Sequence, residues 1–166
     1  VTVVSIRTHL AEIIAKDLVE PRAGAPLTLD VAQLGPDGGA IEDIALGAPD
    51  GPGLSITRAD LRWRIDPWTG FIDITALKLE GVELRAALRP DGTLDLGPIA
   101  PFLAQADGPK RVRLNGLDAS GVIVRLATSR GVATARIAAT GGETGGWRIA
   151  AREMMLPQGL RVGPAA

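Results

Sequence analysis

The chain has 166 residues, of which 18 are basic and 19 acidic, so its formal net charge is -1. That balance gives no general affinity for nucleic acid or anionic membranes, and the absence of cysteine excludes disulfides, thiolate metal sites and cysteine catalysis. Apolar residues make up 46% but aromatic residues only 3%, with 21 glycines and 12 prolines, which favours many short strands over a helical bundle.

The N-terminal segment 1–20 contains an amphipathic helix predicted from Ile6 to Glu20, preceded at 1–5 by a short apolar run that also fits an edge strand. Residues 21–166 predict a single β-domain with a weak internal break near 105–110. The apolar face of the helix consists of Ile6, Leu10, Ile13, Ile14 and Leu18. Pro21 ends the helix. We expect it to pack as a cap over one open end of the sheet. A helix lying on a membrane surface would be expected to carry a polar face rich in Lys and Arg, whereas acids here match bases.

Further elements precede and follow the centre of the chain. Residues 27–35 alternate apolar and polar side chains, and the turn PDGG separates them from a short strand at 40–46. After the centre, 98–106 predicts one or two helical turns and 106–110 a linker. The alternation then resumes from Val112 and ends in a last strand near the C-terminus.

The prediction of β-strands rests mainly on the stretch from Leu54 to Leu96, because apolar and polar residues alternate through nearly all of it. The alternation changes phase within 57–60, between Ala76 and Leu77, and at Gly81. A bulge at each place would return both apolar sets to one face. A straight strand of eighteen residues, beginning at Phe71, would reach about 60 Å. We therefore expect one strongly bent strand, or two strands joined at a kink.

A weak internal repeat relates LKLEGVEL at 77–84 to VRLNGLDA at 112–119. Both segments follow the pattern apolar, basic, Leu, polar, Gly, apolar, acidic. Two such copies predict a supersecondary unit that stacks on itself.

Few residues suggest catalysis or cofactor binding. The single histidine, His9, lies in the predicted helix, and the chain has neither a nucleophile-elbow motif nor a phosphate-binding glycine motif. Several aspartates beside Pro or Gly are typical of turns, namely Asp37, Asp50, Asp66, Asp91 and Asp107. The strand arginines suit a solvated face, and the three tryptophans and two phenylalanines are too scattered for a nucleic-acid stacking platform. We therefore expect no catalytic residue, no metal, no cofactor and no nucleic-acid partner.

The region from Ala11 to Leu103 resembles a repeat unit of the AsmA-like family of bacterial envelope bridge proteins, and within it the YdbH-type members. The resemblance rests on a strand ending in a tryptophan or basic residue, a turn, L-x-G-V-x-L at 79–84 and D-G-x-L-x-L-G at 91–97. It implies a mainly β fold, a curved and largely antiparallel sheet. The open hydrophobic groove of that sheet would carry phospholipids between the inner and outer membranes of a Gram-negative bacterium.

The resemblance also implies a location in the periplasm and an inner-membrane anchor ahead of the groove. The chain does not begin with Met, and VTVVS at 1–5 could be the last residues of such an anchor. We therefore expect a piece of a longer protein, in which further repeats or a partner chain extend the groove.

The residue pattern itself suits a trough for phospholipid acyl chains, because Leu, Ile and Val form a wall with no hydrogen bonds to satisfy. The residues that we expect to contact lipid are Ile56, Leu61, Trp63, Ile65, Ile72, Ile74, Leu77, Leu79, Val82, Leu84, Leu88, Val122, Val124 and Leu126.

Two alternatives stay open. The same residues could close on one another as the dry core of a structural or adhesive β-domain, which would hold no extractable lipid. The other alternative is a hydrolase that uses the turn carboxylates. Single Asp→Asn substitutions that abolish a turnover without unfolding the protein would support it.

Overall fold

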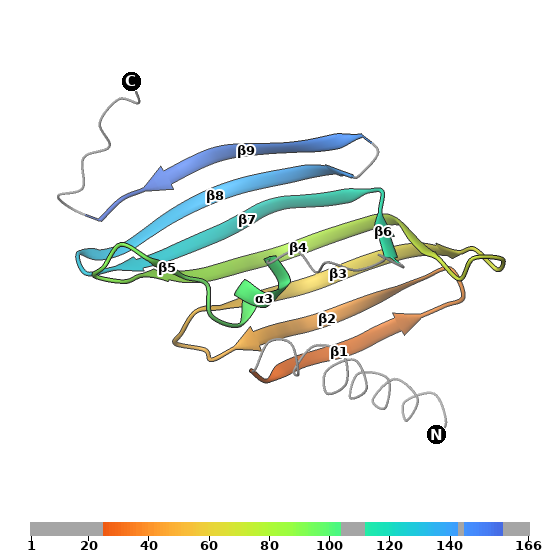
Figure 1. The fold of residues 1–166 in the computed structure, drawn as a ribbon, viewed down its shortest axis with the longest axis horizontal. Helices are drawn as coiled ribbons and strands as arrows, with labels where there is room; N and C mark the ends of the chain where they lie inside the picture. Colours follow the sequence, from red (N-terminus) through yellow and green to blue (C-terminus); the bar gives the residue numbers. More distant parts are fainter. Residues whose placement is uncertain (1–24, 104–111, 143–144, 158–166) are drawn as a thin grey trace.

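The structure is a computed structural model that describes residues 25–103, 112–142 and 145–157. These residues form one curved, open sheet of nine strands with almost no helix (Figure 1). The prediction of a mainly β protein is thereby confirmed. The predicted cap helix at 6–20, with His9, and the turn residue Asp107 lie outside the described residues.

The strands follow the predicted alternation and are separated by short turns. Their bounds are β1 Leu27–Leu34, β2 Gly38–Gly47, β3 Gly53–Ile65, β4 Ile72–Leu88, β5 Leu94–Asp95, β6 Val112–Leu114, β7 Leu117–Thr128, β8 Gly131–Gly142 and β9 Gly146–Met155. A short helical segment between β5 and β6 comprises η2 (Gly97–Ile99) and α3 (Ala100–Leu103). It agrees with the helical turn predicted at 98–106 as far as that segment is described.

The sheet is mixed: most neighbouring strands are antiparallel, as expected, and its centre contains a parallel pair. Its strand order is β1-β2-β3-β4-β7-β8-β9, with β5 and β6 also paired to β4. Neighbours are antiparallel except at β4, which pairs in parallel with β6 and with β7. A parallel pair cannot be joined by a tight turn, and residues 89–111 supply the long crossover that contains η2 and α3. Local alternation does not encode this change of direction.

Residues with a left-handed backbone conformation lie side by side across the middle strands, and the strands bend there. Asp43 in β2, Gly81 in β4 and Gly121 in β7 have φ of 51°, 63° and 72°. Thr57 of β3 lies between Asp43 and Gly81, where the Cα pairing is interrupted on both sides. The predicted phase changes within 57–60 and at Gly81 are therefore confirmed. Because each irregularity shifts the alternation by one residue, the apolar sets on its two sides share one face.

The remaining predicted phase change lies close to its expected place. The register of β3 and β4 shifts between Arg62 and Trp63, where β4 holds the extra residue Thr75. Ile74 consequently projects from the same face as Leu77. Ala76, expected to group with the apolar residues, projects with its partner Arg62 from the opposite face.

The internal repeat has a different offset from the predicted one. In the parallel pair of β4 and β7, Leu77 lies opposite Leu117 and Arg85 opposite Arg125. LKLEGVELRAAL at 77–88 therefore aligns with LDASGVIVRLAT at 117–128, so that the bend glycines Gly81 and Gly121 also correspond. The predicted match of 77–84 with 112–119 is wrong, because the structure pairs Val112 with Ile72 instead.

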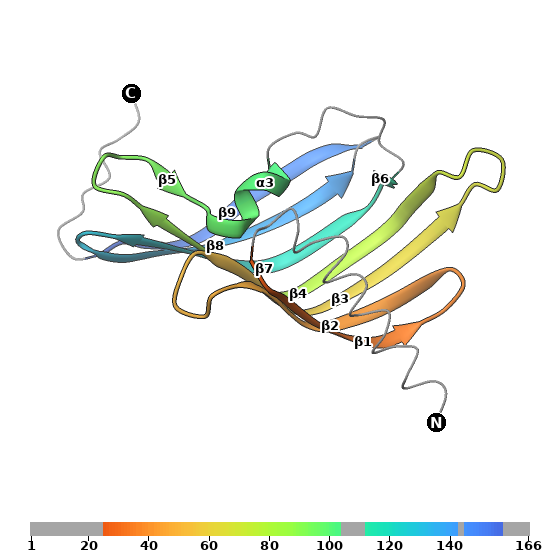
Figure 2. The same cartoon turned by 60° about the horizontal axis from the view of Figure 1, so that its bottom comes forward.

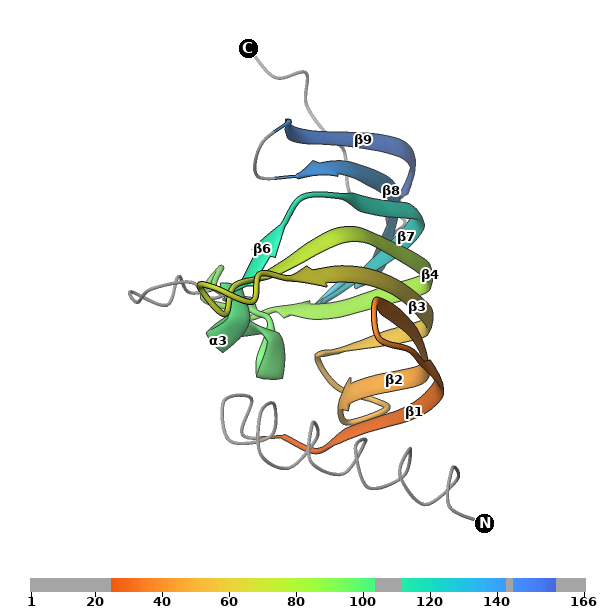
Figure 3. The ribbon, with the colours of Figure 1, turned by 90° about the vertical axis from the view of Figure 1, so that its right-hand side faces the viewer.

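The strands bow in one direction, so the sheet has a concave and a convex face. Figures 2 and 3 show η2 and α3 on the concave side. Ile99 of η2 packs there against Leu27 and Leu46. A second small cluster on the same face contains Val82 and Val122. The described residues include no large side chain that is fully buried, so this core is shallow and one-sided.

Candidate functional site

Apolar side chains form a continuous row across the concave face. Residues that lie directly opposite each other on neighbouring strands project from the same face of a sheet. The central row consists of Leu27, Leu46, Leu54, Leu84, Val124, Ala135 and Met154. It crosses all seven strands of the main path. With about 4.8 Å between strands, the row is about 29 Å long.

Further rows run beside the central one. A second row consists of Val31, Ile41, Ala59, Leu79, Ala119, Ala139 and Ile149. A third consists of Leu34, Gly39, Leu61, Leu77, Leu117, Gly141 and Trp147. Large aliphatic residues dominate in β1 to β4, whereas alanine is frequent in β8 and β9. The concave face is therefore apolar throughout, and small alanine side chains become more frequent toward β9.

All fourteen residues expected to contact lipid lie on the concave face by register and alternation. Val82 and Val122 are buried in the second cluster. Ile65 and Leu88, near opposite ends of the sheet, are 55% and 39% exposed. The other expected residues are half-buried. Their contact with lipid stays a prediction.

Sequence reasoning missed the part of this face that β1, β2 and the crossover contribute. Leu27, Val31 and Leu46 are among its most buried residues. Their alternation was visible in the sequence and predicted the strands, but nothing local placed those strands on the same face as β3 and β4. Ile99 carried no periodic signal, because its burial results from the crossover that lies above β2.

The opposite, convex face carries charged residues in ion pairs. Arg58 of β3 contacts Glu42 of β2 and donates to Asp60 at 2.8 Å. The hydrogen bond and charge of Arg58 hold the pKa of Asp60 below its usual value, and Asp60 in turn raises the pKa of Arg58. Arg125 and Glu83 form another pair between strands, at 3.4 Å. This face is consequently adapted to water.

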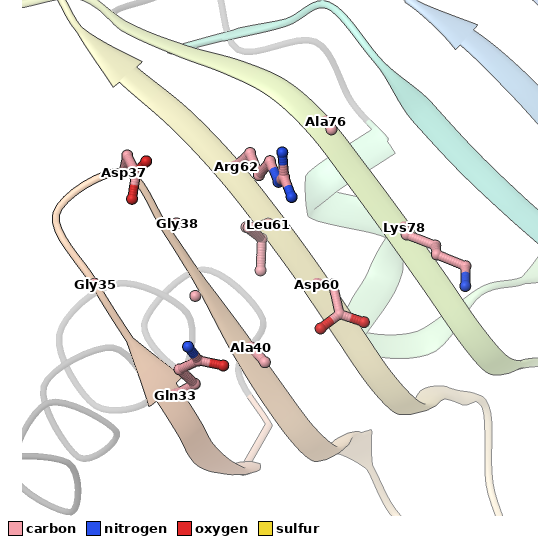
Figure 4. Close-up of a pocket in the computed structure, with 11 residues that line it drawn as sticks. Gln33, Gly35, Asp37, Gly38, Ala40, Asp60, Leu61, Arg62, Ala76 and Lys78 are labelled. Atoms are coloured by element: carbon pink, nitrogen blue, oxygen red, sulfur yellow. The ribbon is translucent and has the colours of Figure 1, made fainter.

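A pocket of about 610 Å³ lies beside the β1–β2 turn (Figure 4). Asp60, Arg62 and Lys78 line it together with Ala40 and backbone glycines. Lys78 pairs with Glu80 at 2.7 Å, and this hydrogen bond raises the pKa of Lys78. The amine is therefore protonated near neutral pH and cannot act as a nucleophile.

The turn aspartates serve the turns in which they lie. The Thr69 side chain and the Trp68 N–H hold the pKa of Asp66 below its usual value, and Thr93 does the same for the pKa of Asp91. Carboxyls with lowered pKa values hold no proton near neutral pH, so they are poor general acids. Within the described ranges, no group of three or more His, Cys, Asp or Glu residues could hold a metal ion.

The three tryptophans and Phe71 lie toward one end of the sheet, on strands that are not all neighbours. Trp63 lies near the end of β3, Trp68 in the β3–β4 turn, and Phe71 directly before β4. Trp147 begins β9 and pairs with Gly141, which pairs with Leu117 at the start of β7. Because β4 and β7 are parallel, their starting ends coincide. We call this edge of the sheet, with Trp63, Trp68, Phe71 and Trp147, the tryptophan end.

No helix in the described part of the chain has the length and apolarity needed to cross a membrane. No family model, curated protein or solved structure matches the chain.

Proposed function

We propose that this chain binds phospholipid acyl chains along its concave face, as a segment of an AsmA-like, YdbH-type carrier of lipids between the inner and outer membranes. The concave face is the hydrophobic groove of that carrier, and the activity is transport without catalysis. The supporting observation is the aliphatic row across all seven strands of the main path. No second sheet of the described residues covers it.

Energetics favours such a face as a lipid path. Exposing a phospholipid with on the order of 30 methylenes to water costs about 24 kcal/mol, at about 0.8 kcal/mol for each CH₂. The central row spans about 29 Å, close to the hydrocarbon thickness of a bilayer of about 30 Å. Since that thickness holds the chains of two leaflets, the row accommodates one lipid or two.

The exposure of the apolar side chains argues against a closed sandwich. Leu54 and Leu84 occupy central strands and are only half-buried. Ile149 and Met154, on the same face of β9, are 71% and 62% exposed. Contiguous exposed apolar surface marks a binding site or an interface. The charged convex face shows that the two faces are adapted to different surroundings.

The proposed setting is the periplasm, with an inner-membrane anchor in the full-length protein. A path for one or two lipids does not connect two membranes. Further repeats or a partner chain therefore continue the groove beyond β1 or β9, whose outer edges end the described sheet. Edge strands supply unpaired backbone groups for such an addition.

Native mass spectrometry of the purified chain, followed by lipid extraction, tests the proposal. We expect co-purified phospholipid in the wild type and its loss in Leu84→Asp, because a carboxylate in the central row makes burial of an acyl chain unfavourable. Ala76→Asp is the matched control. It introduces the same charge at an exposed position on the convex face of the same strand, so lipid should remain.

A lipid-free wild type would contradict the proposal, and unfolding of Leu84→Asp would then indicate a closed core. Leu88→Asp keeps the test decisive if Leu84→Asp does not fold. Leu88 lies on the concave face at the end of β4 and is 39% exposed. Its substitution should reduce bound lipid while circular dichroism stays unchanged.

A further inference from the structure

The tryptophan end concentrates a scarce residue type. The chain has three tryptophans, no tyrosine and two phenylalanines. All three tryptophans and Phe71 lie toward this end: Trp63, Trp68 and Phe71 belong to the β3–β4 hairpin, and Trp147 to β9. Figure 1 shows the β3–β4 turn and the start of β9 on the right-hand side of the sheet. The hairpin groups the first three residues, and strand pairing places Trp147 toward the same end.

The β3–β4 turn presents Trp68 on a well-ordered scaffold. The Asp66 carboxylate accepts hydrogen bonds from the backbone N–H groups of Trp68 at 2.9 Å and Thr69 at 3.4 Å. The Asp66 carbonyl accepts the Gly70 N–H at 2.8 Å, and the Asp66 N–H donates to the Phe71 carbonyl at 2.9 Å. Trp68 itself is 93% exposed. A pre-organised turn loses little conformational entropy when one of its side chains leaves water for a binding partner.

The other tryptophans continue the concave face to the same edge. Trp63 lies close to Gly39, because a Cβ built on Gly39 would be 3.4 Å from the indole ring. The Nε1–H of Trp63 donates a hydrogen bond to the Pro36 carbonyl at 3.2 Å. Trp147 ends the third apolar row. Trp63 lies two residues beyond Leu61 of the third row, on the side of the β3–β4 turn that carries Trp68.

The opposite end of the sheet lacks these features. Its described β4–β5 and β7–β8 turns contain Asp91, Thr93, Ser129 and Arg130. The crossover also packs toward that end, where Pro98 approaches Gly47. Arginines occur at both ends, so charge does not distinguish them. The aromatic residues do.

We propose that the tryptophan end docks on the interfacial region of a phospholipid bilayer, with Trp68 inserted at the boundary between headgroups and acyl chains. Indole combines a large apolar surface with a polar N–H, which is why tryptophan is enriched at that boundary. The membrane then lies along one side of the concave face, whose lipid path runs from β1 to β9, and lipid enters or leaves from that side. Only this last step rests on the proposed transport function; docking itself does not.

Fluorescence of a single tryptophan tests the insertion. In the Trp63→Phe, Trp147→Phe variant of the full chain, Trp68 is the only tryptophan. With neutral phosphatidylcholine vesicles we expect a blue shift of its emission and quenching by lipids brominated on their acyl chains. An unchanged spectrum in a variant that circular dichroism shows to be folded would overturn the proposal.

Vesicle flotation supplies the matched comparison. Trp68→Ser should weaken binding to neutral vesicles about tenfold, the scale of one large side chain withdrawn from a lipid phase. Leu94→Ser is the control, because Leu94 is 55% exposed near the opposite end of the sheet. It should bind as the wild type does. Equal losses in the two variants, or binding that vanishes at about 0.5 M salt, would overturn docking through tryptophan.

The two proposals fail separately. Trp68→Ser should retain co-purified lipid while losing vesicle binding, and Leu84→Asp should lose lipid while its Trp68 still inserts. Loss of vesicle binding together with retained binding to another protein of the envelope would assign the tryptophan end to a protein partner and overturn docking on a bilayer.

Discussion

The two faces of the sheet are built from the same strands but have opposite chemistry. On the concave face, Leu54 lies opposite Leu84, which in turn lies opposite Val124. On the convex face, neighbouring strands are linked by pairs such as Glu42 with Arg58. A single layer can keep this difference only where one face has a surrounding other than water. The apolar face, and not a buried core, is therefore where we propose that the function lies.

The contrast between the faces depends on the left-handed residues Asp43, Gly81 and Gly121, at which the strands bend. A strand that continued in regular alternation through Gly81 would place Leu79 and Val82 on opposite faces. The left-handed conformations of Asp43, Gly81 and Gly121 shift the phase at a common position. Curvature and separation of the two faces thus have one structural cause.

Gly81→Ala is expected to have the largest effect on the fold that separates the two faces. At φ 63° a side chain is strained, and an added Cβ would overlap the hydroxyl of Thr57. We expect a loss of about 3 kcal/mol in the free energy of unfolding, measured by urea denaturation. Gly121→Ala has a similar φ of 72° but no atom near its Cβ, so it should lose only about 1 kcal/mol. Equal losses would show that contact with Thr57 is irrelevant to the bend.

A smaller effect is expected from Leu54→Ala. Its loss of stability distinguishes an exposed apolar face from a closed core. Leu54 contacts both clusters yet is half-buried. We expect a loss of about 1.5 kcal/mol, below the range of about 2–5 kcal/mol for fully buried leucines. Leu46→Ala is the matched control, because Leu46 lies under Ile99 and is 5% exposed. A larger loss for Leu54 than for Leu46 would contradict an open face.

The smallest effect is expected on the convex face, from Asp60→Asn. Because Arg58 lowers the pKa of Asp60 below 3.8 in the folded state, the carboxylate contributes stability above that pH. The contribution is lost as the pH falls through the lowered pKa. The stability difference between wild type and variant should therefore exist near neutral pH, shrink with added salt, and disappear in acid. A difference that grows in acid would contradict this assignment.

The tests on the two ends of the sheet complement those on the two faces. Substitutions on the concave face should alter lipid content, whereas Trp68→Ser should alter vesicle binding alone. Changes on the convex face, such as Ala76→Asp, should alter neither. Function is thus predicted to follow position on the sheet and not the type of residue replaced.

Local pattern was sufficient for the strands and for their faces. Alternation located β1 to β4, and the phase changes near Thr57 and Gly81 identified the bend, because side-chain direction depends only on neighbouring residues. The same signal placed Leu79, Val82 and Leu84 on one face. These features need no knowledge of which strand is the neighbour.

The tertiary structure alone decided which strands pair. Backbone hydrogen bonds are the same for every residue type, so the parallel pairing of β4 with β7, the true offset of the repeat and the burial of Ile99 followed from the crossover. That pairing also brought Trp147 to the edge that carries Trp68. The sequence determined an apolar face and a polar one; the topology determined that the strands form one open sheet and that Trp147 lies toward the end that carries Trp63 and Trp68, because both depend on pairing between distant residues.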